Sequence, residues 1–334
     1  MPLSPNFPQL LHVYFHDWLV GQRNISRHTI LSYRDTWRLF LRFVSLRQQC
    51  RVTDLTFTQL TAEEVLAFLQ HLEQDRQVSI NTRNCRLAAL RSFFAFVADR
   101  EPLALAHCAA VLRIPTKRGT RRAVCYLELA EVAAILAQPA RQTVEGQRDH
   151  ALLALLYNTG ARIQEALDLC PQDIRFETPA QVRSHGKGRK ERLCPLWPET
   201  ANLLAALLRR QPRTPDAPLF VNRYGHPLGA SGVRVQLRRY VRSAAQQLPA
   251  LLAKRISPHT FRHTAAVALV VAGVDVTVIR SWLGHARLDT TNRYAQASMA
   301  TRREALERIA DQPGVGVPPV WKRDDALLAW LESL

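Results

Sequence analysis

The hydrophobic pattern of residues 1–112 is helical throughout. Apolar side chains recur three and four positions apart, which is the spacing of one helix face. Ser26, Thr61 and Ser79 stand directly before such stretches and can cap a first helical turn. With the opening segment Phe7 to Val20, the pattern predicts a small bundle of about four helices. The expected inner positions include Ile30, Tyr33, Trp37, Phe40, Leu41, Val44, Val65, Phe68, Leu69, Leu72, Leu87, Leu90, Phe94 and Val97.

Arginines stand between these apolar positions. The six expected on outer helix faces are Arg34, Arg38, Arg42, Arg83, Arg86 and Arg91. Outward arginines suit contact with DNA phosphates, because the guanidinium group binds phosphate with two parallel hydrogen bonds. A merely solvated face is an equally good interpretation of this pattern taken alone.

The segment 113–122, RIPTKRGTRR, interrupts the helical pattern. It holds Pro115, Gly119 and five basic residues, and it has no apolar period, so it predicts an extended basic linker. The expected organisation is a helical domain at 1–112, the linker at 113–122, a second domain at 123–310, and a C-terminal linker with an amphipathic helix at 311–334.

The second domain mixes helical stretches with one short region of strand-like alternation. Gly160 is suited to end a helix, and Arg162 then stands at the next helix N-terminus, beside amide groups that suit an anion. Between Asp173 and Pro195 the alternation predicts three short antiparallel strands. The expected fold class is therefore mainly α with a small antiparallel β-sheet. The predicted helices lie at about 126–137, 147–158, 198–208, 231–247 and 258–273, and the strands at 174–176, 181–185 and 192–195.

The charge of the chain favours a polyanionic partner. The formal net charge is +17 at pH 7 and the sequence pI is about 10.5, which indicates nucleic acid ahead of a membrane surface. Lysine occurs only at positions 117, 187, 190, 254 and 322, so each lysine is of interest. Lys187, flanked by two glycines, is predicted in a tight hairpin where a long ammonium can reach a ligand, although an ordinary surface-turn lysine is the more common explanation of G-K-G taken alone.

Other compositional features exclude several classes of protein. The six cysteines form no C-x-x-C pair and have no paired histidine spacing, so neither a zinc site nor a disulfide framework is indicated. The longest apolar run, Ala265 to Ala272, is too short to span a bilayer, and no signal peptide opens the chain. We expect a cytoplasmic protein that uses no membrane, metal or cofactor.

The stretch from Ser257 to Tyr294 gathers groups suited to phosphoryl transfer. His259 and Arg262 stand three apart and share one helix face, and His285 and Tyr294 follow. Transfer of a DNA phosphate requires cationic donors for the non-bridging oxygens, an attacking hydroxyl, and an acid for the leaving alkoxide. This stretch supplies the donors and the hydroxyl, so the acid is expected elsewhere.

The order of these motifs resembles one family. The chain contains T-G-x-R-x-x-E as Thr159 to Glu165, G-K-G-x-K-x-R as Gly186 to Arg192, H-x-x-R-H as His259 to His263, L-G-H as Leu283 to His285, and then Tyr294. It resembles the tyrosine recombinases, also called the phage integrase family, and within them the Xer and simple integrase or transposon-recombinase type. Two departures are Pro179 in the first hairpin strand and an unusual tail after Ala310.

The resemblance implies a fold and a site. The fold would be a helical, SAM-like core-binding domain followed by an α+β catalytic domain. Tyr294 would attack the scissile phosphate and form a 3′-phosphotyrosyl link with a free 5′-hydroxyl. A phenol with a pKa of about 10 needs an acceptor for its proton, for which His259 is our choice. Arg162 and Arg262 would bind the non-bridging oxygens, His285 would donate a further hydrogen bond, and Lys187 would protonate the leaving oxygen. Glu165 would orient Arg162, with His263 also in a supporting place.

Two alternatives stay open at this point. A type IB topoisomerase uses the same covalent chemistry to relax DNA, and a non-enzymatic DNA-binding protein would explain the charge alone. As implied partners, the resemblance gives double-stranded DNA, a tetramer assembled on two DNA sites, and a second recombinase or directionality factor. Residues 298–309 and 324–334 are predicted to form amphipathic helices that dock on the same chain or on a neighbouring protomer.

Overall fold

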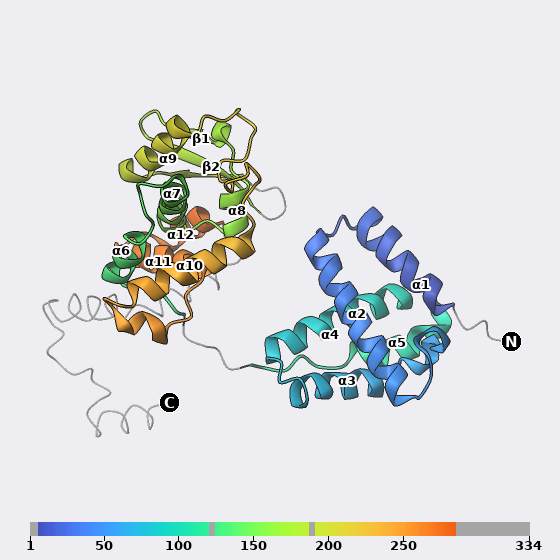
Figure 1. The fold of residues 1–334 in the computed structure, drawn as a ribbon. Helices are drawn as coiled ribbons and strands as arrows, with labels where there is room; N and C mark the ends of the chain where they lie inside the picture. Colours follow the sequence, from blue (N-terminus) through green and yellow to red (C-terminus); the bar gives the residue numbers. More distant parts are fainter. Residues whose placement is uncertain (1–5, 120–123, 187–190, 285–334) are drawn as a thin grey trace, which may run out of the picture. The chain divides into compact units, whose positions relative to one another are not determined.

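The computed structural model of the chain describes residues 6–119, 124–186 and 191–284 (Figure 1). It divides into two compact units, residues 1–121 and 122–334. The predicted fold class is confirmed, because the described residues are mainly helical and include a small antiparallel sheet. Lys187, His285 and Tyr294 lie outside the described residues, as does the whole tail from residue 285 onward.

The first unit is built from helices whose starts follow the predicted caps. The side chains of Ser26, Thr61 and Ser79 accept hydrogen bonds from the backbone amides of Thr29, Glu64 and Thr82. These bonds satisfy amides that a helix leaves unpaired in its first turn. The elements are α1 (Phe7–Val13), the π-helical η1 (Tyr14–Gln22), α2 (Arg27–Arg47), α3 (Ala62–Gln74), α4 (Ile80–Ala98) and α5 (Leu105–Leu112), with short 3₁₀ turns η2 (Val52–Asp54), η3 (Phe57–Gln59) and η4 (Pro102–Ala104).

Aromatic side chains fill the core of this unit. Phe93 on α4 contacts Trp37 on α2 with ring centroids 4.6 Å apart, and its ring also meets those of Phe7 and Tyr14 edge-on. Edge-to-face aromatic pairs add to the free energy gained from burying their area. The packing of α2 against α4 therefore depends on a residue that the helical spacing alone had not singled out.

The prediction that the arginines of α4 face outward is wrong. Arg83 is only 3% exposed, and its guanidinium donates to the Pro115 carbonyl and lies 3.3 Å from a Glu73 carboxylate oxygen. Arg86 is partly buried and donates to the Thr36 hydroxyl, and Arg91 is partly buried and donates to the Leu112 carbonyl. A guanidinium on a long aliphatic stem can cross a helix face and pair with carbonyls, which a periodicity argument does not detect. By contrast, the arginines of α2 are exposed as predicted (Arg34, Arg38 and Arg42).

The first residues of the predicted linker belong structurally to this unit. Asn84 donates to the Lys117 carbonyl over 2.8 Å and accepts from the Lys117 amide over 3.1 Å. The Lys117 ammonium lies 2.8 Å from Glu73. With the Arg83–Pro115 bond, these contacts fasten residues 115–117 along α3 and α4.

In the second unit, α7 is the central element (Figure 1). Most of its residues are buried, and α9 and α11 pack against it. Its continuous apolar run therefore suits a helix enclosed by others. The elements are α6 (Leu129–Leu136), α7 (Val144–Thr159), α8 (Ile163–Leu167), η5 (Pro171–Asp173), β1 (Ile174–Arg175), β2 (Gln181–His185), β3 (Glu191–Pro195), α9 (Pro198–Arg210), α10 (Ala230–Ala244), η6 (Pro249–Ala253), α11 (Pro258–Val271) and α12 (Val276–Leu283).

The sheet has the predicted antiparallel order β1-β2-β3. His185 pairs with Glu191 at the closing end of the β2–β3 hairpin, and Gln181 pairs with Pro195 at the other end. Phe176 lies outside β1 and is exposed, so the first strand is shorter than predicted. No helix among the described residues is long and apolar enough to cross a membrane.

The buried position of Arg83 leads to a testable prediction. Arg83→Met should lower the free energy of unfolding by about 2–4 kcal/mol, because it removes a buried charged group and leaves Glu73 and the Pro115 carbonyl with fewer donors. The matched variant Arg38→Met, at an exposed site on α2, should change it by less than about 0.5 kcal/mol. Urea denaturation of the full chain measures both. Equal stability of the two variants would contradict the structural role of Arg83.

Candidate active site

The site is organised around the end of α7. Gly160 follows the last residue of this helix with φ of 58°, a left-handed conformation that glycine adopts without steric cost. The chain turns at Gly160, and Arg162 then stands directly before α8, as its N-cap residue. Both features were predicted from the T-G-x-R sequence, and both are confirmed.

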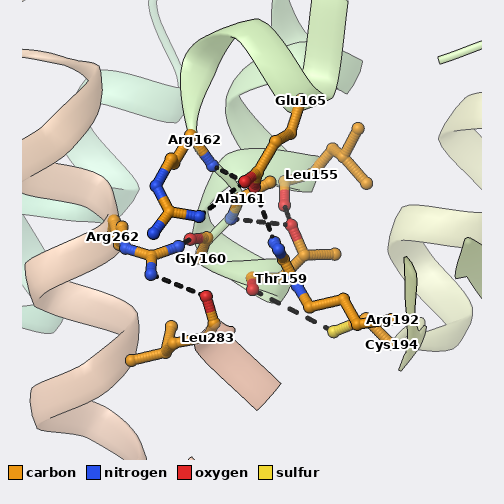
Figure 2. Close-up of polar contacts among 10 residues, drawn as sticks. All are labelled: Leu155, Thr159, Gly160, Ala161, Arg162, Glu165, Arg192, Cys194, Arg262 and Leu283. Atoms are coloured by element: carbon orange, nitrogen blue, oxygen red, sulfur yellow. Dashed lines mark hydrogen bonds and ion pairs between the residues drawn. The ribbon is translucent and has the colours of Figure 1, made fainter. Parts of the chain in front are cut away.

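Arg262, on the second turn of α11, is buried against this turn. Its side chain is 1% exposed, and Nη1 donates to the Gly160 carbonyl over 2.7 Å (Figure 2). Nη2 donates to the Leu283 carbonyl at the end of α12 over 2.6 Å. Carbonyls at helix C-termini carry partial negative charge, so the two helix ends compensate the buried cation.

The close approach of α12 to the end of α7 explains why glycine is required there. A Cβ atom at position 160 would lie 2.5 Å from Leu283 Cδ2 and 3.4 Å from Ala265 Cβ. α12 itself ends at Gly284, which is also left-handed, with φ of 65°. The next residue in the chain is His285, so the end of α12 fixes the point from which the chain continues to that histidine.

Arg162 lies on the open side of this arrangement. Its side chain is 40% exposed, and Nη1 donates to Glu165 Oε1 over 2.6 Å. The Arg162 amide donates to the other carboxylate oxygen of Glu165 over 2.9 Å. The predicted contact between Glu165 and Arg162 is therefore present, and it leaves part of the guanidinium accessible to a ligand.

Glu165 is a buried carboxylate held by two arginines. It is 6% exposed and accepts a further hydrogen bond from Arg192 Nη2 on β3 over 2.9 Å (Figure 2). Burial by itself raises the pKa of Glu165, but the hydrogen bonds and charge of Arg192, with the hydrogen bonds from Arg162, outweigh it and lower the pKa below its usual value. The carboxylate therefore stays ionised at neutral pH.

Arg192 is the contributor that sequence reasoning missed. It is the last residue of the G-K-G-x-K-x-R motif, but no role was predicted for it. Its side chain is 9% exposed. The strand alternation could have indicated this position. Arg192 pairs with the buried Ser184, and the next pair on the same face, Val182 with Cys194, is buried too. An arginine on the inner side of a strand requires a buried partner.

His259 lies in the first turn of α11, one turn before Arg262. Ser257 and Thr260 form the N-terminal cap, with the Ser257 amide donating to Thr260 Oγ1 over 3.0 Å. The His259 ring is exposed at the surface, yet desolvation by the surrounding protein is the largest influence that lowers its pKa. The charges of Arg262 and Arg162 lower it further. The lowered pKa favours the neutral ring, in which one nitrogen can accept a proton.

The described part of the site can therefore bind an anion and accept a proton. Arg162 stands directly before α8, His259 and Arg262 stand one turn apart on α11, and the charges of both arginines act on the His259 ring. The placement of Lys187, His285 and Tyr294 lies outside the described residues. The His263 ring lies beside His259, with centroids 4.5 Å apart.

Other features of the described residues do not compete with this site. A cavity of about 600 Å³ lies between the start of α7, the turn 222–224 and α10, and none of the predicted site residues that the structure describes lines it. A phosphate diester on a DNA duplex needs an open surface with donors more than it needs an enclosed cavity. No group of three or more His, Cys, Asp or Glu side chains in the described ranges is arranged to hold a metal ion.

Comparison with known proteins identifies the family. The phage integrase family model matches residues 126–301, and the model for the N-terminal SAM-like domain of phage integrases matches residues 13–101. The chain belongs to the phage integrase family. Its relatives include the y4rC protein of Sinorhizobium fredii, named as an integrase/recombinase, which is 40% identical over 97% of each chain. The tyrosine recombinase XerC of Pelobacter propionicus is 30% identical over 92% of this chain and 96% of its own length.

Solved structures share the fold of this phage integrase family member. The XerH site-specific recombinase bound to a palindromic difH substrate has a TM-score of 0.66 at 21% identity, covering 91% of this chain and 85% of that one. The Tn1549 transposon integrase in complex with a circular intermediate DNA has a TM-score of 0.67 at 18% identity, covering 90% and 98%. The family and the names of its relatives assign the chain to the site-specific tyrosine recombinases and not to the type IB topoisomerases.

The electrostatic coupling of His259 to the arginines gives a pH prediction. Its pKa should lie below the ordinary value of 6.5, so the ring gains its proton only as pH falls through that lowered value. Arg162→Gln should raise the pKa of His259, because one positive charge is removed. An NMR titration of protein with isotopically labelled histidine measures this pKa. The signal that is lost in His259→Asn is that of His259. Arg234→Gln, on the exposed face of α10, should leave the pKa unchanged. A fall or no change in Arg162→Gln would contradict the predicted coupling.

Proposed function

We propose that this recombinase cuts and rejoins double-stranded DNA through a 3′-phosphotyrosyl intermediate with Tyr294 as the nucleophile. The observation that carries the proposal is the contact of Arg262 with the Gly160 carbonyl, two residues before Arg162, with His259 one turn before Arg262 on α11. Two guanidinium groups and one proton acceptor are what attack by a phenol on a phosphate diester requires beside the nucleophile.

Each described residue has a role in this reaction that follows from its contacts. Arg262 is held by two carbonyls, so its guanidinium keeps a constant direction, and we assign it to a non-bridging oxygen of the phosphate. Arg162 is partly exposed and can bind the second non-bridging oxygen. His259 accepts the proton of the Tyr294 hydroxyl as the phenolic oxygen bonds to phosphorus.

The other roles rest on the positions of residues in the motifs. As the bond from phosphorus to the 5′-oxygen breaks, Lys187 gives its proton to that oxygen, and His285 donates a hydrogen bond to the phosphate while negative charge builds. In the rejoining step a 5′-hydroxyl attacks the phosphotyrosine and releases Tyr294. The bond energy is kept in the covalent link, so neither ATP nor a divalent metal enters the balance.

DNA as the substrate is supported by charge and by the relatives. The chain carries a net charge of +17, and exposed arginines line α2 and one face of α10. The exposed arginines of α10 are Arg234, Arg238, Arg239 and Arg242. The XerH and Tn1549 proteins were solved with DNA substrates. We further propose that four copies assemble on two DNA sites within a mobile genetic element or resolution system, with a second recombinase or directionality factor as a further partner.

The nucleophile gives the first test of this function. Tyr294→Phe should bind DNA as the wild type does and form no covalent adduct, since only the hydroxyl is lost. A nicked suicide substrate, which traps the adduct, measures this on a denaturing gel. Arg162→Ala and Arg262→Ala should reduce the cleavage rate by about 10²–10³-fold, the scale for loss of one preorganised donor. An adduct formed by Tyr294→Phe would refute the assignment.

The leaving-group acid gives the second test. Lys187→Ala should cleave an ordinary substrate slowly and recover on a substrate with a 5′-bridging phosphorothiolate, because the sulfur leaves without a proton. Lys190→Ala, three positions later in the same motif, is the matched control and should need no rescue. The two rates are compared at one pH with and without the sulfur. Selective rescue of the Lys190 variant instead would move the acid role to that residue.

A further inference from the structure

Arg192 contacts several parts of the site, although the reaction described above assigns it no role. It lies on β3, five positions after Lys187 in the sequence. Its Nη2 donates to Glu165 Oε2 at the start of α8. Its Nη1 lies 3.2 Å from the place of a Cβ at Gly284, the residue before His285. One side chain thus connects the hairpin, the helix that begins after Arg162, and the end of α12.

The ion pair between Arg192 and Glu165 is largely shielded from solvent. The side chains of Arg192 and Glu165 are 9% and 6% exposed. A buried ion pair contributes little net stability compared with apolar packing, since desolvation of both ions offsets their attraction. In addition, Arg192 Nε is buried without a hydrogen-bond acceptor among the described residues, which costs free energy. Stability alone therefore does not account for this arrangement.

We propose that Arg192 is a positioning residue that holds the Glu165 carboxylate beside the end of α12, and so sets the direction of the Arg162 guanidinium toward the DNA phosphate. This inference rests on the proposed function. Glu165 has two oxygens for three donors, and Arg192 and the Arg162 amide both bind Oε2. The remaining oxygen, Oε1, binds the Arg162 guanidinium over 2.6 Å. With Oε2 fixed, Oε1 keeps one position, and Arg162 keeps one direction.

Loss of Arg192 should affect the chemical step more than DNA binding. Without it, Glu165 loses its hydrogen bond and charge partner on β3, and the carboxylate can turn toward Arg162 and withdraw that guanidinium from the phosphate. The pKa of Glu165 should also rise, because burial is then opposed by Arg162 alone.

The experiment compares Arg192→Met, Arg192→Lys and the control Arg183→Met, an exposed arginine on β2 of the same hairpin. Single-turnover cleavage of a suicide substrate gives the rate, and a gel-shift titration gives Kd. We expect Arg192→Met to cleave about 10–100-fold more slowly with Kd unchanged, the usual scale for removing a residue that orients a reacting group. Arg192→Lys should fall between, because it keeps the charge and loses the planar fork. Arg183→Met should cleave normally.

A double-mutant comparison separates positioning from a merely structural role. If Arg192 acts through Glu165, then Arg192→Met combined with Glu165→Gln should be no slower than the slower single variant. Arg192→Met should also lose rate at a higher pH than the wild type when pH is lowered, and Glu165→Gln should abolish that difference. Additive losses, a normal rate in Arg192→Met, or a slower rate matched by a weaker Kd would each overturn the proposal.

Two controls keep the outcome clear. If Arg192→Met does not fold, Arg192→Lys decides the question, since an unchanged rate in the folded lysine variant overturns the proposal. Tyr294→Phe tests the proposed function separately. An adduct in that variant rejects the nucleophile, whereas a normal rate in the Arg192 variants rejects only the positioning role.

Discussion

The buried charge of Arg262 is the constraint on which the second unit depends. A guanidinium with almost no contact with water is tolerable only where fixed oxygens surround it. The structure meets this condition by ending two helices, α7 and α12, at the same place, so that their last carbonyls face one cation. Both helices end at a left-handed glycine, Gly160 after α7 and Gly284 after α12, where the chain turns away from the helix axis.

A continuous set of polar contacts extends from this cation. Arg262 binds the Gly160 carbonyl, two residues before Arg162, and Arg162 binds Glu165, which binds Arg192 on β3. Electrostatic catalysis depends on donors that already point to where charge develops, since reorienting them during the reaction costs free energy. A set of groups fixed from several elements has little freedom to reorient. The one group held less tightly is Arg162, which is also the most exposed of the arginines in this set.

Features that depend on local backbone physics were predicted well from the sequence. The caps at Ser26, Thr61 and Ser79, the helix end at Gly160 and the hairpin around residue 186 each follow from a few adjacent residues. Features that depend on a distant partner were not. Arg83 appeared as an outward position because its acceptors, Glu73 and Pro115, come from other segments. Arg192 was unassigned for the same reason, since Glu165 lies 27 positions earlier in the chain. The roles of Lys187, His285 and Tyr294 rest on motif positions alone.

The fastening of residues 115–117 to α3 and α4 bears on how the protein searches DNA. Had the whole basic segment 113–122 been a free tether, the second unit could have sampled a large volume once the first had bound. With Arg83, Asn84 and Glu73 holding its first half, only the few residues after Lys117 remain to join the units. For a ligand that binds both units, a short connection raises the effective local concentration of the second unit, which for short linkers reaches the order of mM. The second binding event is then intramolecular.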